Sequence, residues 1–156
     1  MNERSESRRN TSAGDTVEVR IDANPIYLCV TRSVARKIGE VARMPEDDIE
    51  AVTLALEEAM TNVIRHGYGG PCQRPIIVRF TRRSDSGIGG ELEIVVRDYG
   101  RQVDPESIKS RDLNEVRPGG LGVHLIQSMM DQVEYSCPAD GGMQLRMVKR
   151  ITPSES

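Results

Sequence analysis

Two polar side chains one helical turn apart, Glu58 and Asn62, form the most informative pair in the sequence. They belong to the segment from Leu54 to His66, and on a helix residues i and i+4 stand one above the other, about 6 Å apart along the axis. A carboxylate can take a proton from a hydroxyl, and an amide oxygen can bind Mg²⁺ while phosphates and water fill its other positions. Taken alone, the pair also suits an ordinary helix with one solvated face.

A third polar residue, Asp98, comes where a strand pattern ends. Apolar and polar residues alternate from Glu91 to Arg97, which predicts a strand, and the chain then turns at Tyr99 and Gly100. Ligands of layered α/β folds tend to bind at the carboxyl ends of strands. Asp98 is therefore a candidate ligand-binding residue.

A glycine-rich segment, Arg117-Pro118-Gly119-Gly120-Leu121-Gly122, runs into an amphipathic helix. Closely spaced glycines before a helix let backbone N–H groups approach an anion at the positive helix end. This is a phosphate cradle in outline, although the same pattern also occurs as a simple tight turn. It is neither a Walker A loop nor the dinucleotide-binding glycine motif that follows a strand.

The elements that position these residues follow from hydropathy and breaker patterns. A stripe of Ile26, Val30, Val34, Ile38 and Val41 predicts the apolar face of a first helix, which Asn24 caps and Pro45 ends. The remaining elements are expected, in chain order, as a strand at 16–21 at an edge or in a dimer, the second helix ending near Gly67, strands at 76–82 and 91–98, a lid at 101–118 with a short helical turn, the glycine-led helix, and strands at 132–136 and 143–151.

This order predicts an α+β fold, a two-layer α/β sandwich with a mixed, mostly antiparallel sheet and the helices on one face. We expect residues 16–151 to form one domain. Residues 1–15 are polar and charged, which predicts a disordered tail, and 152–156 a flexible end.

Composition excludes several classes of function. The net charge of −3, with 29% charged residues of both signs, gives no basic field for nucleic acid or anionic lipid. The apolar runs are too short to span a membrane, and the first residues lack the apolar core of a signal peptide, so we expect a cytoplasmic protein. Three widely separated cysteines, Cys29, Cys72 and Cys137, support neither a disulfide framework nor a zinc site.

The three polar segments together resemble the boxes of the GHKL ATPase superfamily, which includes gyrase, Hsp90, histidine kinases and MutL. In order stand EAMTN from Glu58 with His66-Gly67-Tyr68, then Asp98-Tyr99-Gly100, then Gly119-Gly120-Leu121-Gly122. More closely, the chain resembles the anti-sigma factor serine kinases of the RsbW and SpoIIAB type, over about residues 15 to 151. The resemblance implies the GHKL ATP-binding fold.

It also implies roles for individual residues. Asn62 would hold Mg²⁺ on the ATP phosphates, Glu58 would be the catalytic base, and Thr61 would lie beside the nucleotide. Asp98 would accept the adenine amino group, with Gly100 letting the base approach the backbone. The lid residues Arg117, Gly119, Gly120, Leu121 and Gly122 would contact the phosphates, with Arg117, beside Pro118, as the candidate for the terminal phosphate. Of the two histidines, His66 is expected to cap or pack at the helix end, and His124 to be structural or at the surface.

The function that the resemblance implies is an anti-sigma factor that is also a Mg²⁺- and ATP-dependent serine/threonine kinase. It would sequester a sigma factor and phosphorylate a STAS-domain antagonist of that activity, and it would act as a homodimer without binding nucleic acid or membrane. A non-catalytic ATP-binding module that binds a protein partner is the alternative. An ATPase without a protein substrate is a third reading.

Overall fold

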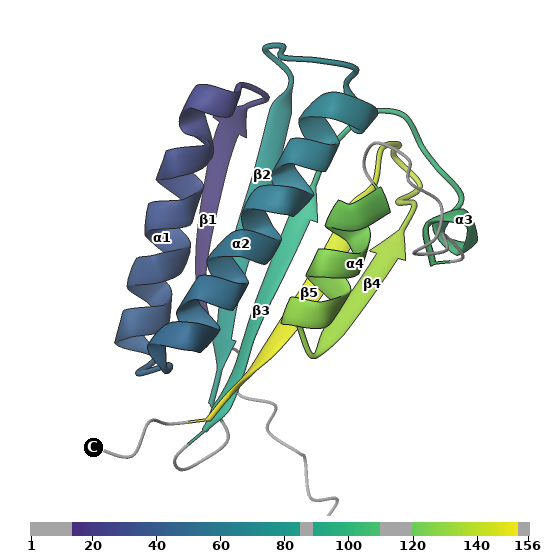
Figure 1. The fold of residues 1–156 in the computed structure, drawn as a ribbon. Coiled ribbons are helices and arrows are strands. Elements are labelled where there is room, and N and C mark those ends of the chain that lie inside the picture. The colour runs from purple at the N-terminus through teal and green to yellow at the C-terminus, as the bar shows by residue number, and fades with distance from the viewer. Residues whose placement is uncertain (1–13, 85–88, 110–119, 153–156) are drawn as a thin grey trace, which may run out of the picture.

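The computed structural model describes residues 14–84, 89–109 and 120–152. Five strands form one sheet, and helices lie against it (Figure 1). The elements are β1 (Asp15–Asp22), a 3₁₀ turn (Pro25–Tyr27), α1 (Leu28–Val41), α2 (Glu46–Asn62) continued by the π-helical turn η2 (Val63–Gly67), β2 (Pro75–Arg83), β3 (Gly90–Arg97), α3 (Pro105–Lys109), α4 (Gly120–Met129), β4 (Gln132–Ser136) and β5 (Gln144–Ile151).

The sheet has the strand order β1-β2-β3-β5-β4, and every described pairing is antiparallel. The predicted element order and the two-layer arrangement are confirmed, and the sheet that was expected to be mixed is antiparallel at all four pairings. Because β5 inserts between β3 and β4, the last strand lies beside the strand that leads into Asp98. β1 is an edge strand of the sheet, which was one of the two positions predicted for it.

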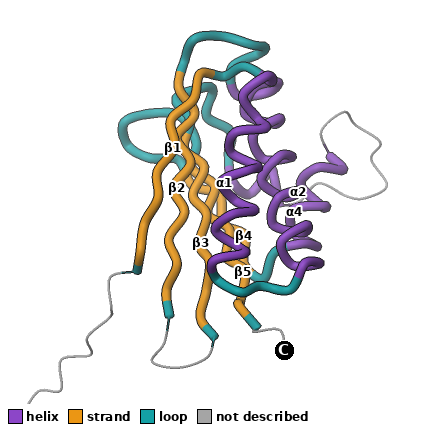
Figure 2. Tube along the Cα trace, turned by 90° about the vertical axis from the view of Figure 1, so that its left-hand side faces the viewer, coloured by secondary structure: helices purple, strands orange, loops and turns teal. Residues whose placement is uncertain are grey.

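Helices α1, α2 and α4 all cover the same face of the sheet (Figure 2). Alternate residues of the strands point into this layer, among them Val78, Ile94 and Met147, which are fully buried. α2 lies between α1 and α4 and packs on both. Burying apolar side chains between the two layers is the main force that holds α2 in place.

The apolar face of α1 differs from the predicted stripe. Ile26, Val30 and Val41 are exposed, whereas the buried residues of this helix are Thr31, Ala35 and Gly39. A Cβ atom at Gly39 would lie 2.8 Å from Ile49 Cγ1, so α1 and α2 approach too closely for large side chains between them. Helix packing therefore buries the small residues of α1 and leaves part of the apolar stripe outside.

The opposite face of the sheet carries an ion cluster around a buried carboxylate. Glu93, only 9% exposed, accepts hydrogen bonds from Arg83 (3.0 Å) and Arg146 (2.6 Å). Burial alone would raise the pKa of Glu93, but the two guanidinium groups lower it below its ordinary value.

Among the described residues, no helix is long and apolar enough to cross a membrane.

Candidate functional site

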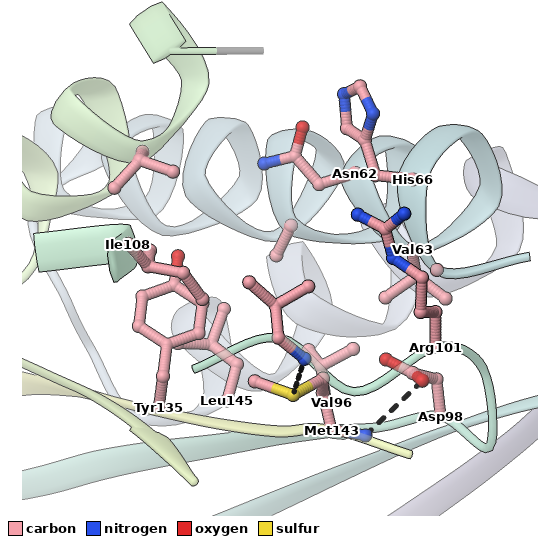
Figure 3. A pocket seen from close by; sticks show the side chains of 14 residues that line it. Asn62, Val63, His66, Val96, Asp98, Arg101, Ile108, Tyr135, Met143 and Leu145 are labelled. Carbon is pink, nitrogen blue, oxygen red and sulfur yellow. Dashed lines mark hydrogen bonds between the residues drawn. The ribbon is translucent and has the colours of Figure 1, made fainter. Parts of the chain in front are cut away.

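A pocket lies between the end of α2, the end of β3 and the β4–β5 hairpin (Figure 3). Its walls are mainly apolar, with Val96 from β3, Val123 from α4 and Leu145 from β5 among them. Asn62, at the end of α2, and Asp98, directly after β3, both line it. An apolar pocket with a few polar groups is the usual form of a small-molecule site.

The carboxylate of Asp98 is buried and oriented by the backbone. The side chain is 3% exposed, and its Oδ1 atom accepts hydrogen bonds from the N–H groups of Gly100 (2.8 Å) and Met143 (3.4 Å). Its second oxygen is turned toward the interior of the pocket (Figure 3). Burial raises the pKa of Asp98, and the two N–H groups and the nearby charges of Arg97 and Arg74 partly oppose that rise. The pocket thus presents a fixed acceptor for a hydrogen-bond donor.

Glu58 and Asn62 converge on the first turn of α4. A Cβ atom at Gly122 would lie 2.9 Å from Glu58 Oε2 and 3.4 Å from Asn62 Nδ2. The predicted i, i+4 pair therefore shares one face of α2, and that face meets the glycine-led helix. Glu57, one position away, turns elsewhere and forms an ion pair with Arg32 at 3.3 Å.

Of the remaining predicted site residues, the structure describes Thr61, Gly100, Gly120 and Leu121. Thr61 is half-buried on α2 and is not part of the pocket lining. Gly100 follows Asp98, and a Cβ atom there would lie 2.3 Å from the carbonyl oxygen of Gly67, so only glycine fits this turn. Gly120 and Leu121 are the first two residues of α4. Arg117 and Gly119 lie outside the described residues.

Several pocket residues were not predicted as site residues from the sequence. Tyr135, Met143 and Leu145 come from the β4–β5 hairpin, which reaches the site only because β5 lies beside β3. Arg101 follows Gly100 and extends its guanidinium into the space between Asn62 and Asp98 (Figure 3). His66 was expected to cap or pack at the helix end, and it lines the pocket at the end of α2. For Arg101, proximity to the Asp98 turn was an available signal.

The donor atoms at the site suit a Mg²⁺ ion that is held mainly by the phosphates of a bound molecule. Among the described residues there is no cluster of three or more His, Cys, Asp or Glu side chains that could hold a metal ion. Asn62 projects its amide into the pocket (Figure 3), and Mg²⁺ commonly takes one or two protein oxygens and completes its shell with phosphates and water. The residues present therefore fit a phosphate-borne Mg²⁺.

Comparison with known proteins agrees with this geometry. The family model described as histidine kinase-like ATPase domain matches residues 21–149. The chain belongs to this family. It is 33% identical over 149 residues to the serine-protein kinase RsbW of Staphylococcus aureus, which covers 90% of this chain and 89% of the relative. It is 30% identical over 146 residues to the protein of the same name from Bacillus velezensis, covering 88% and 86%.

Two solved structures share the fold of this histidine kinase-like ATPase domain. One contains the RsbU and RsbW domains of Rv1364c from Mycobacterium tuberculosis, with a TM-score of 0.64 and 17% identity over 88% of this chain and 32% of that chain. The other is the SiaB–SiaC complex from Pseudomonas aeruginosa, with a TM-score of 0.63 and 16% identity over 85% of this chain and 88% of that one. The predicted GHKL-type fold is confirmed.

Proposed function

We propose that this chain is a Mg²⁺- and ATP-dependent serine protein kinase that acts in a partner-switching pathway. The observation that carries the proposal is the convergence of Glu58 and Asn62 on Gly122, beside a pocket with Asp98 at its other end. Family membership and the similarity to kinases named RsbW support ATP as the phosphate donor and a serine side chain as the acceptor.

Asp98 would select adenine. With Oδ1 held by two backbone N–H groups, the other oxygen is available to accept a hydrogen bond from the 6-amino group of adenine. Guanine presents an oxygen at the corresponding position and would meet the carboxylate acceptor to acceptor. The apolar side chains of Val96, Leu145 and Met143 would cover the ring.

Asn62 and Glu58 would serve the phosphates and the acceptor. Asn62 would hold Mg²⁺, which neutralizes phosphate charge when bound. Phosphate transfer joins the serine hydroxyl oxygen to the γ-phosphorus as the bond to ADP breaks, and Glu58 would take the hydroxyl proton. The glycine-led start of α4 would place backbone N–H groups near the phosphates, with Gly119, Gly120, Leu121 and Arg117 in the roles that the resemblance implies.

The partners follow from the resemblance to RsbW-type kinases. We propose that the phosphorylated substrate is a STAS-domain antagonist and that the chain also sequesters a sigma factor, so that phosphorylation of the antagonist keeps sigma bound. We propose a homodimer as the active assembly and the cytoplasm as its location. Sedimentation of the purified protein with and without a sigma subunit tests the assembly.

The decisive experiment incubates the full chain with labelled ATP, Mg²⁺ and a STAS-domain protein from the same genome. Glu58→Ala should abolish label transfer while nucleotide affinity changes less than threefold. Glu57→Ala is the matched control, because that carboxylate is one position away on the same helix and pairs with Arg32 instead.

Transfer that Glu58→Ala leaves unchanged would refute the base role. ATP binding without transfer to any STAS partner would favour the alternative, a regulatory module in which ATP shapes a protein-binding surface. Partner-independent ATP hydrolysis would instead favour the ATPase without a protein substrate.

A further inference from the structure

The turn that carries Asp98 is held by a side chain from the end of the second helix. The hydroxyl of Tyr68 accepts a hydrogen bond from the Tyr99 N–H at 2.9 Å and donates one to the Pro75 carbonyl at 2.6 Å. One small hydroxyl thus joins the residue after Asp98 to the first residue of β2. Tyr68 is half-buried, and burial raises the pKa of its hydroxyl, which is protonated near neutral pH in any case.

Arg74 completes the hold on the same turn. Its guanidinium donates to the Tyr99 carbonyl and lies over the Tyr68 ring, 4.6 Å from the ring center. The N–H and the carbonyl of Tyr99 are therefore each bound by a side chain from the segment between α2 and β2. The ring contact also fixes the position of the tyrosine itself.

A second link lies two residues further along, at Arg101. The Arg101 N–H donates to the Gly67 carbonyl at 2.9 Å, directly before Tyr68. Between these two links, the Gly100 N–H orients Asp98 Oδ1. The direction of the carboxylate is thus set by the position of residues 67 and 68, at the end of the helix that carries Glu58 and Asn62.

We propose that Tyr68 is a positioning residue for adenine recognition, which aligns Asp98 with the 6-amino group by fixing the Asp98-Tyr99-Gly100 turn to the end of α2. This inference rests on the proposed function. It ties base recognition to the same helix that presents Glu58 and Asn62, so that the base and the phosphates would be placed by one rigid support. Tyr68 itself lines no part of the pocket wall and acts through Asp98.

The test compares the affinity of ADP with that of inosine diphosphate, which carries an oxygen in place of the 6-amino group. Titration calorimetry on the full chain should show that Tyr68→Phe weakens ADP binding about tenfold, the effect of losing the hydrogen bond between the misaligned Asp98 carboxylate and the 6-amino group. Binding of inosine diphosphate should change less than twofold. A residue that only stabilized the fold would lower the melting temperature or weaken both ligands equally, and would leave their ratio unchanged.

Two further variants sharpen the result. In an Asp98→Asn background, Tyr68→Phe should no longer alter the ratio of the two affinities, because the carboxylate that it aligns is gone. Arg74→Met, at an exposed position, should also lower the preference for ADP over inosine diphosphate. It replaces Tyr68→Phe in the test if that variant unfolds. Tyr27→Phe, an exposed tyrosine before α1, is the control and should change neither affinity.

The outcomes separate this inference from the proposed function. A wild-type protein that prefers ADP, with a Tyr68→Phe variant that keeps the full preference, would overturn the positioning role and leave the adenine site in place. A wild-type protein without preference for ADP over inosine diphosphate would overturn the adenine site itself, and the role of Tyr68 with it.

Discussion

Replacing Gly122 by alanine should slow phosphate transfer while leaving the fold intact. The added methyl carbon would lie 2.9 Å from Glu58 Oε2, whereas ordinary contacts begin at 3.4 Å, so the carboxylate must retreat by about half an ångström. Displacing a reacting group by about 1 Å can lower a rate about a hundredfold, and half that displacement predicts a loss of about tenfold. The contact with Asn62 stays ordinary, so ADP affinity should change less than threefold.

Stability should move in the other direction. Gly122 lies in the first turn of α4, and alanine is more favourable than glycine in a helix by at most about 1 kcal/mol. The atom that must yield is the far end of a flexible glutamate, so its displacement costs little. The melting temperature of Gly122→Ala should therefore equal or exceed that of the wild type.

The assay is single-turnover transfer of labelled phosphate from ATP to the STAS-domain partner, with thermal unfolding measured on the same samples. Gly100→Ala is the contrast, because there the methyl carbon would meet the backbone oxygen of Gly67 at 2.3 Å, and backbone cannot rotate away. That variant should melt earlier and lose ADP binding. A transfer rate for Gly122→Ala within twofold of the wild type would refute the placement of Glu58 as the base.

Two carboxylates give opposite dependences of stability on pH. Asp98→Asn should weaken ATP binding and its preference over GTP, yet raise the free energy of unfolding of the nucleotide-free protein at pH 7. Burial raises the pKa of Asp98, so the folded state of the wild type loses stability as the pH rises through that pKa. The increase in free energy of unfolding that Asp98→Asn gives should therefore vanish below about pH 4 in urea titrations. Glu93→Gln should lower the free energy of unfolding at pH 7 by about 1 to 2 kcal/mol, because two guanidinium groups lose a charged partner. Since those groups lower the Glu93 pKa, the wild type should lose this contribution as the pH falls below about 4.3. A difference in free energy of unfolding between the wild type and Glu93→Gln that stays constant with pH would contradict the role of the charged Glu93.

Local patterns were sufficient to predict most of the fold. β3 alternates between the two faces of the sheet, and a period of two residues is visible without knowledge of its neighbours. α2 buries Ile49, Val52 and Leu56 on one side, as the helical period predicts. Asn24 caps the first helical turn through a hydrogen bond from the Ile26 N–H at 3.1 Å.

The failures concern contacts between distant segments. The exposure of Val30 depends on how closely α1 approaches α2, and that distance is set by Gly39 against Ile49. Likewise, Met143 reaches Asp98 only because β5 pairs with β3 rather than continuing outward beyond β4. Neither the spacing of apolar residues nor the turn signals of the last hairpin contain that information.

Gly122 shows how one motif can serve two requirements. The sequence explains the glycines at the start of α4 through the approach of backbone N–H groups to an anion. In the structure, Gly122 has a second effect that needs no ligand, because it leaves room for the Glu58 carboxylate, which an added methyl carbon would displace. The close contact between α2 and α4 that brings the helix start to the predicted phosphates also sets the position of the predicted base. An alanine at this position therefore tests the placement of the base separately from the cradle.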